Sequence, residues 1–155
     1  MKNIYNSLQA IKLHNQIKVS TIIPMSALNN SYPPYVGTFS PKLVSIMHSI
    51  LDFLSQIKSP FMKYVYPYFS YASNPKDFPL PYALFQEETP NEVVYKNLFN
   101  TSVDALIYAM EALGHSNIPI VFVESGWLSS GNANSGANVA SAKIYNNNYI
   151  KQYFF

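Results

Sequence analysis

The sequence predicts an α/β fold in which helices alternate with parallel strands. Three runs rich in β-branched and aromatic residues cover 17–23, 61–69 and 120–123, and segments with helical periodicity separate them. Strands that alternate with helices in this way form a parallel sheet, because each crossover returns the chain to the same end of the sheet.

Four segments carry apolar residues three or four positions apart, the pattern of an amphipathic helix. They cover about 4–13, 41–58, 98–113 and 137–149. The second should begin at Ser40-Pro41, a capping residue followed by a proline in the first turn. Gly114 follows the third segment, as expected just beyond a helix C-terminus.

Prolines mark the ends of the predicted strands. Pro24 ends the first strand, and a long loop containing Tyr32-Pro33-Pro34-Tyr35 follows it. Within 61–69, Pro67 belongs at the end of the strand rather than in its middle. Tyr66 and Tyr68 are therefore expected near the mouth of the sheet.

Composition limits the classes of function. The chain has 155 residues, which suits one domain. Aromatic residues reach 15%, including 13 Tyr, so the chain is not a disordered one. Aromatic faces suit flat, hydroxyl-rich ligands, although core packing explains most of the tyrosines. The net charge of +2 comes from scattered lysines, so no nucleic-acid partner is predicted.

No cofactor, metal or membrane segment is predicted. The sequence has no glycine-rich phosphate loop and no cysteine, and His14, His48 and His115 lie far apart in the sequence, without metal-ligand spacing. No apolar run approaches a transmembrane span, and the N-terminus lacks the apolar core of a signal peptide. Asn29 and Asn100 begin possible glycosylation sequons.

The stretch from Ile118 to Gly131 combines a strand with polar groups. Residues 120–123 form a short apolar run, expected to be a fully buried strand, and Glu124 follows it directly. The C-terminal ends of parallel strands are where α/β sheets place their chemistry. From position alone, Glu124 is either such a catalytic carboxylate or an exposed strand-end residue in a salt bridge.

The residues around Glu124 indicate more than its position alone does. The motif VESGW, followed by Ser and Gly, resembles the signature of glycoside hydrolase family 17, the plant β-1,3-glucanases and their β-1,3-1,4-glucanase relatives. Further similar segments occur in the family's order: NQIKVST, SYPP, VYPYFSYASNP, LPYALF and NLFNTSVDA. One departure is Leu128, where the family usually has proline.

This resemblance implies that residues 1–155 form a single partial catalytic domain. Its fold would be part of a TIM (β/α)8 barrel, comprising the fourth to seventh helices and the fifth to seventh parallel strands. A barrel opened in this way would expose sheet edges, through which the chain is expected to self-associate. Family members are usually secreted or vacuolar, whereas no signal peptide is recognised in this chain.

The resemblance also implies a reaction, the retaining hydrolysis of internal β-1,3-glucosidic bonds in β-1,3- or mixed-linkage glucans. Glu124 would be the nucleophile, and Tyr66 and Trp127 would shape the cleft. Tyr64 stands where the family usually has a cleft Asn. The family's acid/base Glu, preceded by Asn, lies on the fourth strand and is absent from this chain, which is therefore expected to be truncated and impaired. Asn91-Glu92 repeats that dipeptide in a loop and is not assigned.

A non-catalytic alternative stays open. The chain would then be an inactive family fragment that binds β-glucan weakly at most.

Overall fold

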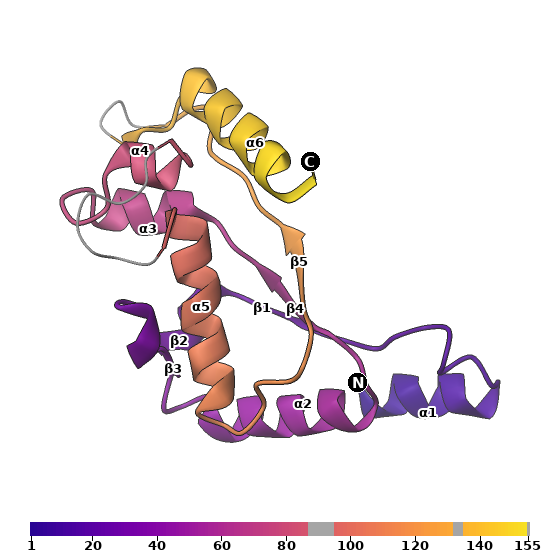
Figure 1. Ribbon diagram of the computed structural model, residues 1–155. Helices are drawn as coiled ribbons and strands as arrows, with labels where there is room; N and C mark the ends of the chain where they lie inside the picture. The colour runs from indigo at the N-terminus through magenta and orange to yellow at the C-terminus, as the bar shows by residue number, and fades with distance from the viewer. Residues whose placement is uncertain (87–94, 132–134, 155) are drawn as a thin grey trace. The chain divides into compact units, whose positions relative to one another are not determined.

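The computed structural model describes residues 1–86, 95–131 and 135–154. They form two compact units, each with its own hydrophobic core (Figure 1). The first unit comprises Met1–Tyr64 and Ala105–Val123, and the second comprises Val65–Asp104 and Glu124–Phe155. Helix α5 (Leu98–Glu111) contributes its first half to the second unit and its second half to the first.

A three-stranded sheet runs through the first unit in the order β1–β4–β5. Its strands are β1 (Ile22–Ile23), β4 (Phe61–Tyr64) and β5 (Ile120–Glu124). β1 and β4 are parallel, with Ile22 opposite Met62, which confirms the predicted orientation.

The first strand is shorter than predicted. Of residues 17–23, only Ile22 and Ile23 pair as a strand. Their register places the preceding residues beside Pro60, which has no N–H to donate to a ladder. The Ser20 hydroxyl instead donates a hydrogen bond to the Pro60 carbonyl at 2.6 Å.

Two helices of the first unit lie close to their predicted places. They are α1 (Lys2–Ala10) and α2 (Val44–Gln56). α2 begins later than Ser40-Pro41 because the N–H groups of Leu43 and Val44 both bond to the Ser40 carbonyl, which makes a turn before the helix. The core of this unit joins α2, β4 and the second half of α5 through fully buried side chains. They include Leu51, Leu54, Phe61, Ala105 and Ala109.

A small antiparallel hairpin occupies the segment predicted as a long loop. It consists of β2 (Leu28–Asn30) and β3 (Thr38–Phe39), with two 3₁₀ turns, η1 (Met25–Ala27) and η2 (Pro34–Val36). Gly37 sits directly against α5: a Cβ atom at this position would lie 2.1 Å from the Ala105 carbonyl oxygen. The hairpin can pack here only because residue 37 has no side chain.

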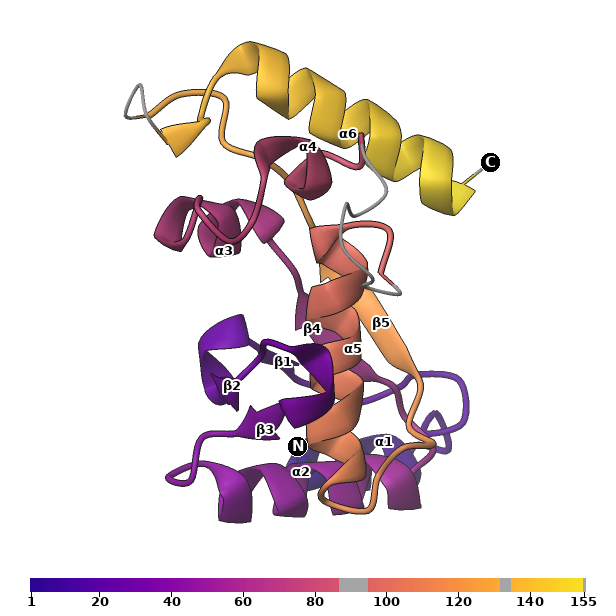
Figure 2. The ribbon, with the colours of Figure 1, turned by 60° about the vertical axis from the view of Figure 1, so that its left-hand side comes forward.

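The second unit is helical. It contains α3 (Pro67–Ser73), α4 (Leu80–Ala83), the first half of α5, and α6 (Val139–Phe154). α3, α4 and α6 lie near one another in both ribbon views (Figures 1 and 2). The predicted strand over 61–69 is wrong beyond Tyr64, because Pro67 starts α3. Proline suits the first turn of a helix, where its fixed φ fits and its missing N–H has no partner to lose.

Aromatic side chains dominate the core of the second unit. Trp127 and Tyr145 lie with ring centroids 5.6 Å apart, and Tyr68 meets the Trp127 ring nearly at right angles, at 5.2 Å. This packing accounts for many of the tyrosines that the composition displays.

β5 is less buried than predicted. Val121 and Val123 are 40% and 42% exposed, so the expectation of a fully buried strand is wrong for them. β5 is an edge strand with a single neighbour in the described sheet, β4, and part of its surface therefore faces solvent. Self-association through this edge stays a prediction.

Among the described residues, no helix is both long and apolar enough to cross a membrane.

Candidate functional site

Glu124 is the last residue of β5, and its side chain is exposed. Its backbone carbonyl accepts a hydrogen bond from the Val65 N–H at 3.1 Å, just beyond the end of β4. This bond fixes the backbone of Glu124 beside the segment that carries Tyr66. A carboxylate at the C-terminal end of β5 is thereby held beside the start of α3.

Tyr66 is joined to Glu124 directly. The Tyr66 hydroxyl donates a hydrogen bond to Oε1 of Glu124. Tyr66 caps the start of α3, and the following Pro67 begins that helix. A hydroxyl that donates to a carboxylate holds the carboxylate in one orientation. Sequence reasoning named both residues, but it did not predict their contact.

Ser125 and Tyr145 hold the segment after β5 through a second set of hydrogen bonds. Sequence reasoning missed both residues. The Ser125 hydroxyl donates to the Val65 carbonyl at 2.8 Å and lies 2.5 Å from the Tyr145 hydroxyl. Tyr145 is fully buried on α6, and this burial raises the pKa of its hydroxyl, which therefore stays protonated and able to donate. The hydrogen bond from Tyr145 depends on where α6 packs, which the sequence does not show.

Trp127 is mainly a packing residue. Its ring is 7% exposed, and its Nε1–H donates to the Gly136 carbonyl at 2.9 Å. Tyr71 and Tyr145 flank the ring. A buried indole with a satisfied N–H holds the loop after Glu124 in place, and only a small part of it is available to a ligand.

An open groove of about 450 Å³ surrounds Glu124. Tyr66, Phe69 and Leu128 contribute side chains to its wall. Phe69 is 60% exposed and Leu128 44% exposed, so the groove pairs one carboxylate with uncovered apolar surface. Such a surface suits a ligand with alternating hydroxyl groups and C–H faces. Phe69 is a further residue that sequence reasoning did not assign.

The third predicted substrate-binding residue, Tyr64, ends β4 in the first unit and is not one of the described residues that line the groove. Asn91-Glu92, which was not assigned a role, lies outside the described residues. Glu124 is the only carboxylate among the groove's described lining residues.

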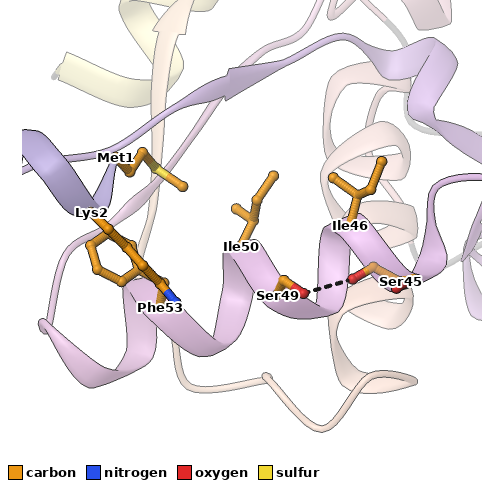
Figure 3. Close-up of a pocket in the computed structure, with 7 residues that line it drawn as sticks. All are labelled: Met1, Lys2, Ser45, Ile46, Ser49, Ile50 and Phe53. Carbon is orange, nitrogen blue, oxygen red and sulfur yellow. Dashed lines mark hydrogen bonds between the residues drawn. The ribbon is translucent and has the colours of Figure 1, made fainter.

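A second hollow, of about 300 Å³, lies in the first unit (Figure 3). Ile46 and Ile50 project from α2 on the side where Met1 lies, and the Ser49 hydroxyl donates to the Ser45 carbonyl at 3.0 Å within the helix. Its described lining residues include Lys2, Ser45 and Ser49 but no carboxylate, histidine or tyrosine.

Two histidines that are far apart in the sequence meet in the structure. His48 and His115 lie with ring centroids 5.5 Å apart, on either side of Asp52. They are 67 positions apart in the chain (115 − 48), so spacing along the sequence gave no sign of the contact.

Comparisons with known proteins agree with this geometry. Residues 1–154 match the family described as glycosyl hydrolases family 17. A glucan endo-1,3-beta-glucosidase of Nicotiana tabacum is 40% identical over 150 residues, covering 97% of this chain and 42% of that protein. Glucan endo-1,3-beta-glucosidase A of Solanum lycopersicum is 42% identical, covering 97% and 44%. The chain thus spans less than half the length of these curated relatives.

Solved structures give the same result. A β-1,3-glucanase and allergen of Cryptomeria japonica pollen superposes with a TM-score of 0.91 at 48% identity, covering 97% of this chain and 47% of that one. One of two plant β-glucan endohydrolases with distinct substrate specificities superposes with a TM-score of 0.89 at 35% identity, covering 97% and 50%.

Proposed function

Because the chain belongs to glycosyl hydrolase family 17, we propose that it carries the nucleophile side of a retaining endo-β-1,3-glucanase. The observation that carries this proposal is Glu124 itself: an exposed carboxylate at a strand end, held by Tyr66 in a groove. On this proposal β1, β4 and β5 correspond to the fifth, sixth and seventh strands of the family's barrel.

The first chemical step forms a covalent intermediate. An oxygen of Glu124 attacks the anomeric carbon, the bond from that carbon to the glycosidic oxygen breaks, and the departing oxygen takes a proton from a general acid. Water then attacks the same carbon from the opposite face, gives its proton to the conjugate base of the general acid and releases Glu124, so that two inversions retain the configuration.

The residues around Glu124 have separate tasks in this reaction. Tyr66 donates to the carboxylate and directs its free oxygen toward the groove. Phe69 offers an exposed ring on which a sugar ring can stack, and Trp127 holds the loop from beneath. We assign Tyr66 to substrate positioning, Trp127 chiefly to supporting the site, and Tyr64 to no contact within this groove.

The general acid is not assigned. In retaining enzymes it is a second carboxyl group about 5 to 5.5 Å from the nucleophile. None of the groove's other described lining residues is a carboxylic acid. Turnover of unactivated glucan should therefore be low in this chain alone, since loss of general acid catalysis reduces rates by about 100- to 10,000-fold.

The test compares two substrates. A soluble β-1,3-glucan needs a protonated leaving group, whereas an aryl β-laminaribioside with a dinitrophenolate leaving group does not. We expect the purified chain to cleave the aryl substrate much faster than the glucan, and a Glu124→Gln variant to cleave neither. Undiminished cleavage by Glu124→Gln would refute the assignment of the nucleophile.

The absence of a second carboxylate from the described groove also favours a second candidate, a chain that binds β-glucan without cleaving it. Laminari-oligosaccharides would then change the fluorescence of Trp127 while the aryl substrate stays intact. A mixed-linkage oligosaccharide in the same titration measures the linkage preference.

A further inference from the structure

A second cluster of reactive side chains lies in the first unit, apart from the residues assigned to hydrolysis. His48 and Asp52 are one helical turn apart on α2, and His48 Nδ1 lies 2.9 Å from Asp52 Oδ2. His115 follows α5, and its Nε2 lies 3.1 Å from Asp52 Oδ1. One carboxylate thus holds two imidazoles that come from different elements.

The backbone of His115 is fixed by the end of α5. Gly114 adopts a left-handed φ of 81°, which favours glycine. The His115 N–H donates to the Met110 carbonyl at 3.0 Å, and the Gly114 N–H donates to the Glu111 carbonyl at 2.8 Å. These two bonds form a Schellman cap, which sets the direction in which the chain leaves the helix. The third side chain of the cluster is therefore positioned by backbone geometry.

The three side chains offer two nitrogens and one oxygen within 4.8 Å of one another. His115 is 12% exposed, whereas His48 and Asp52 are 52% and 46% exposed, so solvent reaches the cluster from one side. To bind one ion, the exposed pair must rotate so that all three ligand atoms face it. Neutral imidazole also carries its proton on either nitrogen, so the nitrogen nearest Asp52 can offer a lone pair instead.

We propose that His48, Asp52 and His115 form a binding site for Zn²⁺, with water as the fourth ligand. Two imidazoles and a carboxylate match the donor set that zinc takes in three-residue sites, at about 2.0 to 2.2 Å for each bond. Imidazole nitrogen favours zinc over Mg²⁺ and Ca²⁺, which prefer oxygen ligands. Zinc here would join α2 to the end of α5 and so stabilise the first unit.

The test is a calorimetric titration of the metal-free chain of residues 1–155 with ZnCl₂, with MgCl₂ as the comparison ion. We expect one Zn²⁺ to bind per chain and the thermal unfolding midpoint to rise, and we expect no Mg²⁺ binding. His48→Gln and His115→Gln should each weaken Zn²⁺ binding by at least about 10- to 100-fold, since loss of a residue that merely orients a ligand already has this effect.

His14→Gln is the matched control, because His14 lies in the same unit but outside the cluster. Circular dichroism without metal checks that each variant folds, and His48 is exposed enough to be replaced without loss of packing. The absence of saturable Zn²⁺ binding, or binding that survives both His48→Gln and His115→Gln, would overturn the proposal. Equal weakening by His14→Gln would overturn it as well.

Discussion

The Tyr66 hydroxyl donates a hydrogen bond to Oε1 of Glu124, although the two residues lie 58 positions apart in the chain. Both sit where a parallel strand has just ended, which is why the sheet brings them together. One oxygen of Glu124 is thereby engaged, and the proposed function assigns the attack on the substrate to the other.

Tyr66→Phe removes this donor while keeping the ring. A hydrogen bond to a charged group contributes about 1.5 to 3 kcal/mol, so we expect cleavage of the aryl β-laminaribioside to fall about 10- to 100-fold. Initial rates at saturating substrate measure the effect. Tyr35→Phe, the same change at an exposed tyrosine outside the groove, should leave the rate unchanged. An unaltered rate in Tyr66→Phe would show that the contact has no part in the reaction.

Tyr145→Phe tests the support beneath the strand end. The variant loses the hydrogen bond between the buried Tyr145 hydroxyl and Ser125. We expect the free energy of unfolding to fall by about 1 kcal/mol, a typical value for one hydrogen bond, as followed by urea denaturation. Tyr108→Phe, at a partly exposed position in the first unit, is the control and should change stability less. Equal stability of Tyr145→Phe and the parent chain would argue against this support.

Lys63 is buried on β4, and its ammonium nitrogen has no hydrogen-bond partner among the described residues. Burial lowers the pKa of Lys63 to about 7. Between pH 7 and about 10.4, the unfolded chain binds a proton that the folded chain does not, so stability rises with pH across this window. Below pH 7 Lys63 is protonated in both the folded and the unfolded chain, and the full free-energy cost of burying its charge remains.

Lys63→Met should remove that penalty. We expect the variant to be more stable at pH 7 by several kcal/mol, on the order of 1.4 kcal/mol per unit of pKa difference, and to be less dependent on pH. Urea midpoints at pH 7 and pH 9.5 measure both effects. Lys42→Met, at an exposed lysine, should reproduce neither. A parent chain whose midpoint does not rise between these pH values would contradict the buried, low-pKa lysine.

Gly37→Ala tests the contact between the hairpin and α5. The new methyl group would lie 2.1 Å from the Ala105 carbonyl oxygen, which is backbone and cannot rotate away. We expect a loss of about 1 to 3 kcal/mol in unfolding free energy, as for other overpacked sites. Gly126→Ala meets its nearest neighbour at 3.6 Å, an ordinary contact, and should cost little. Equal midpoints for the two variants would show that the hairpin is not held against α5.

Much of the fold was predictable, and the exceptions have physical causes. The helices over 44–56 and 98–111 follow apolar periodicity, which sequence displays directly. The helix over 139–154 was predicted from the same pattern, but it exposes Val139 and Ile150 and buries Ala142 and Tyr145 instead. The extent of β1 depends on where its partner strand begins, and α3 replaces a predicted strand because Pro67 suits a helix start better than a ladder. The hairpin of β2 and β3 has too few residues to show alternation.

Part of the candidate site was also predictable from the sequence, and part was not. Glu124 and Tyr66 were predicted because they sit in recognisable motifs at strand ends. Ser125, Phe69 and Tyr145 were missed because their roles depend on the groove and on the docking of α6, which local patterns do not record. The cluster of His48, Asp52 and His115 joins α2 to the residue that follows the α5 cap. These segments are far apart in the sequence, so no spacing rule could find the cluster.

The most direct test of Glu124 as nucleophile is covalent trapping. A 2,4-dinitrophenyl 2-deoxy-2-fluoro-β-laminaribioside needs no general acid, and its fluorine slows release of the intermediate, so the glycosyl group stays attached. Intact-mass and peptide mass spectrometry should find one fluoro-glycosyl group per chain, on the peptide containing Glu124, and none on Glu124→Gln. Attachment at another residue, or no attachment to folded protein, would contradict the central claim.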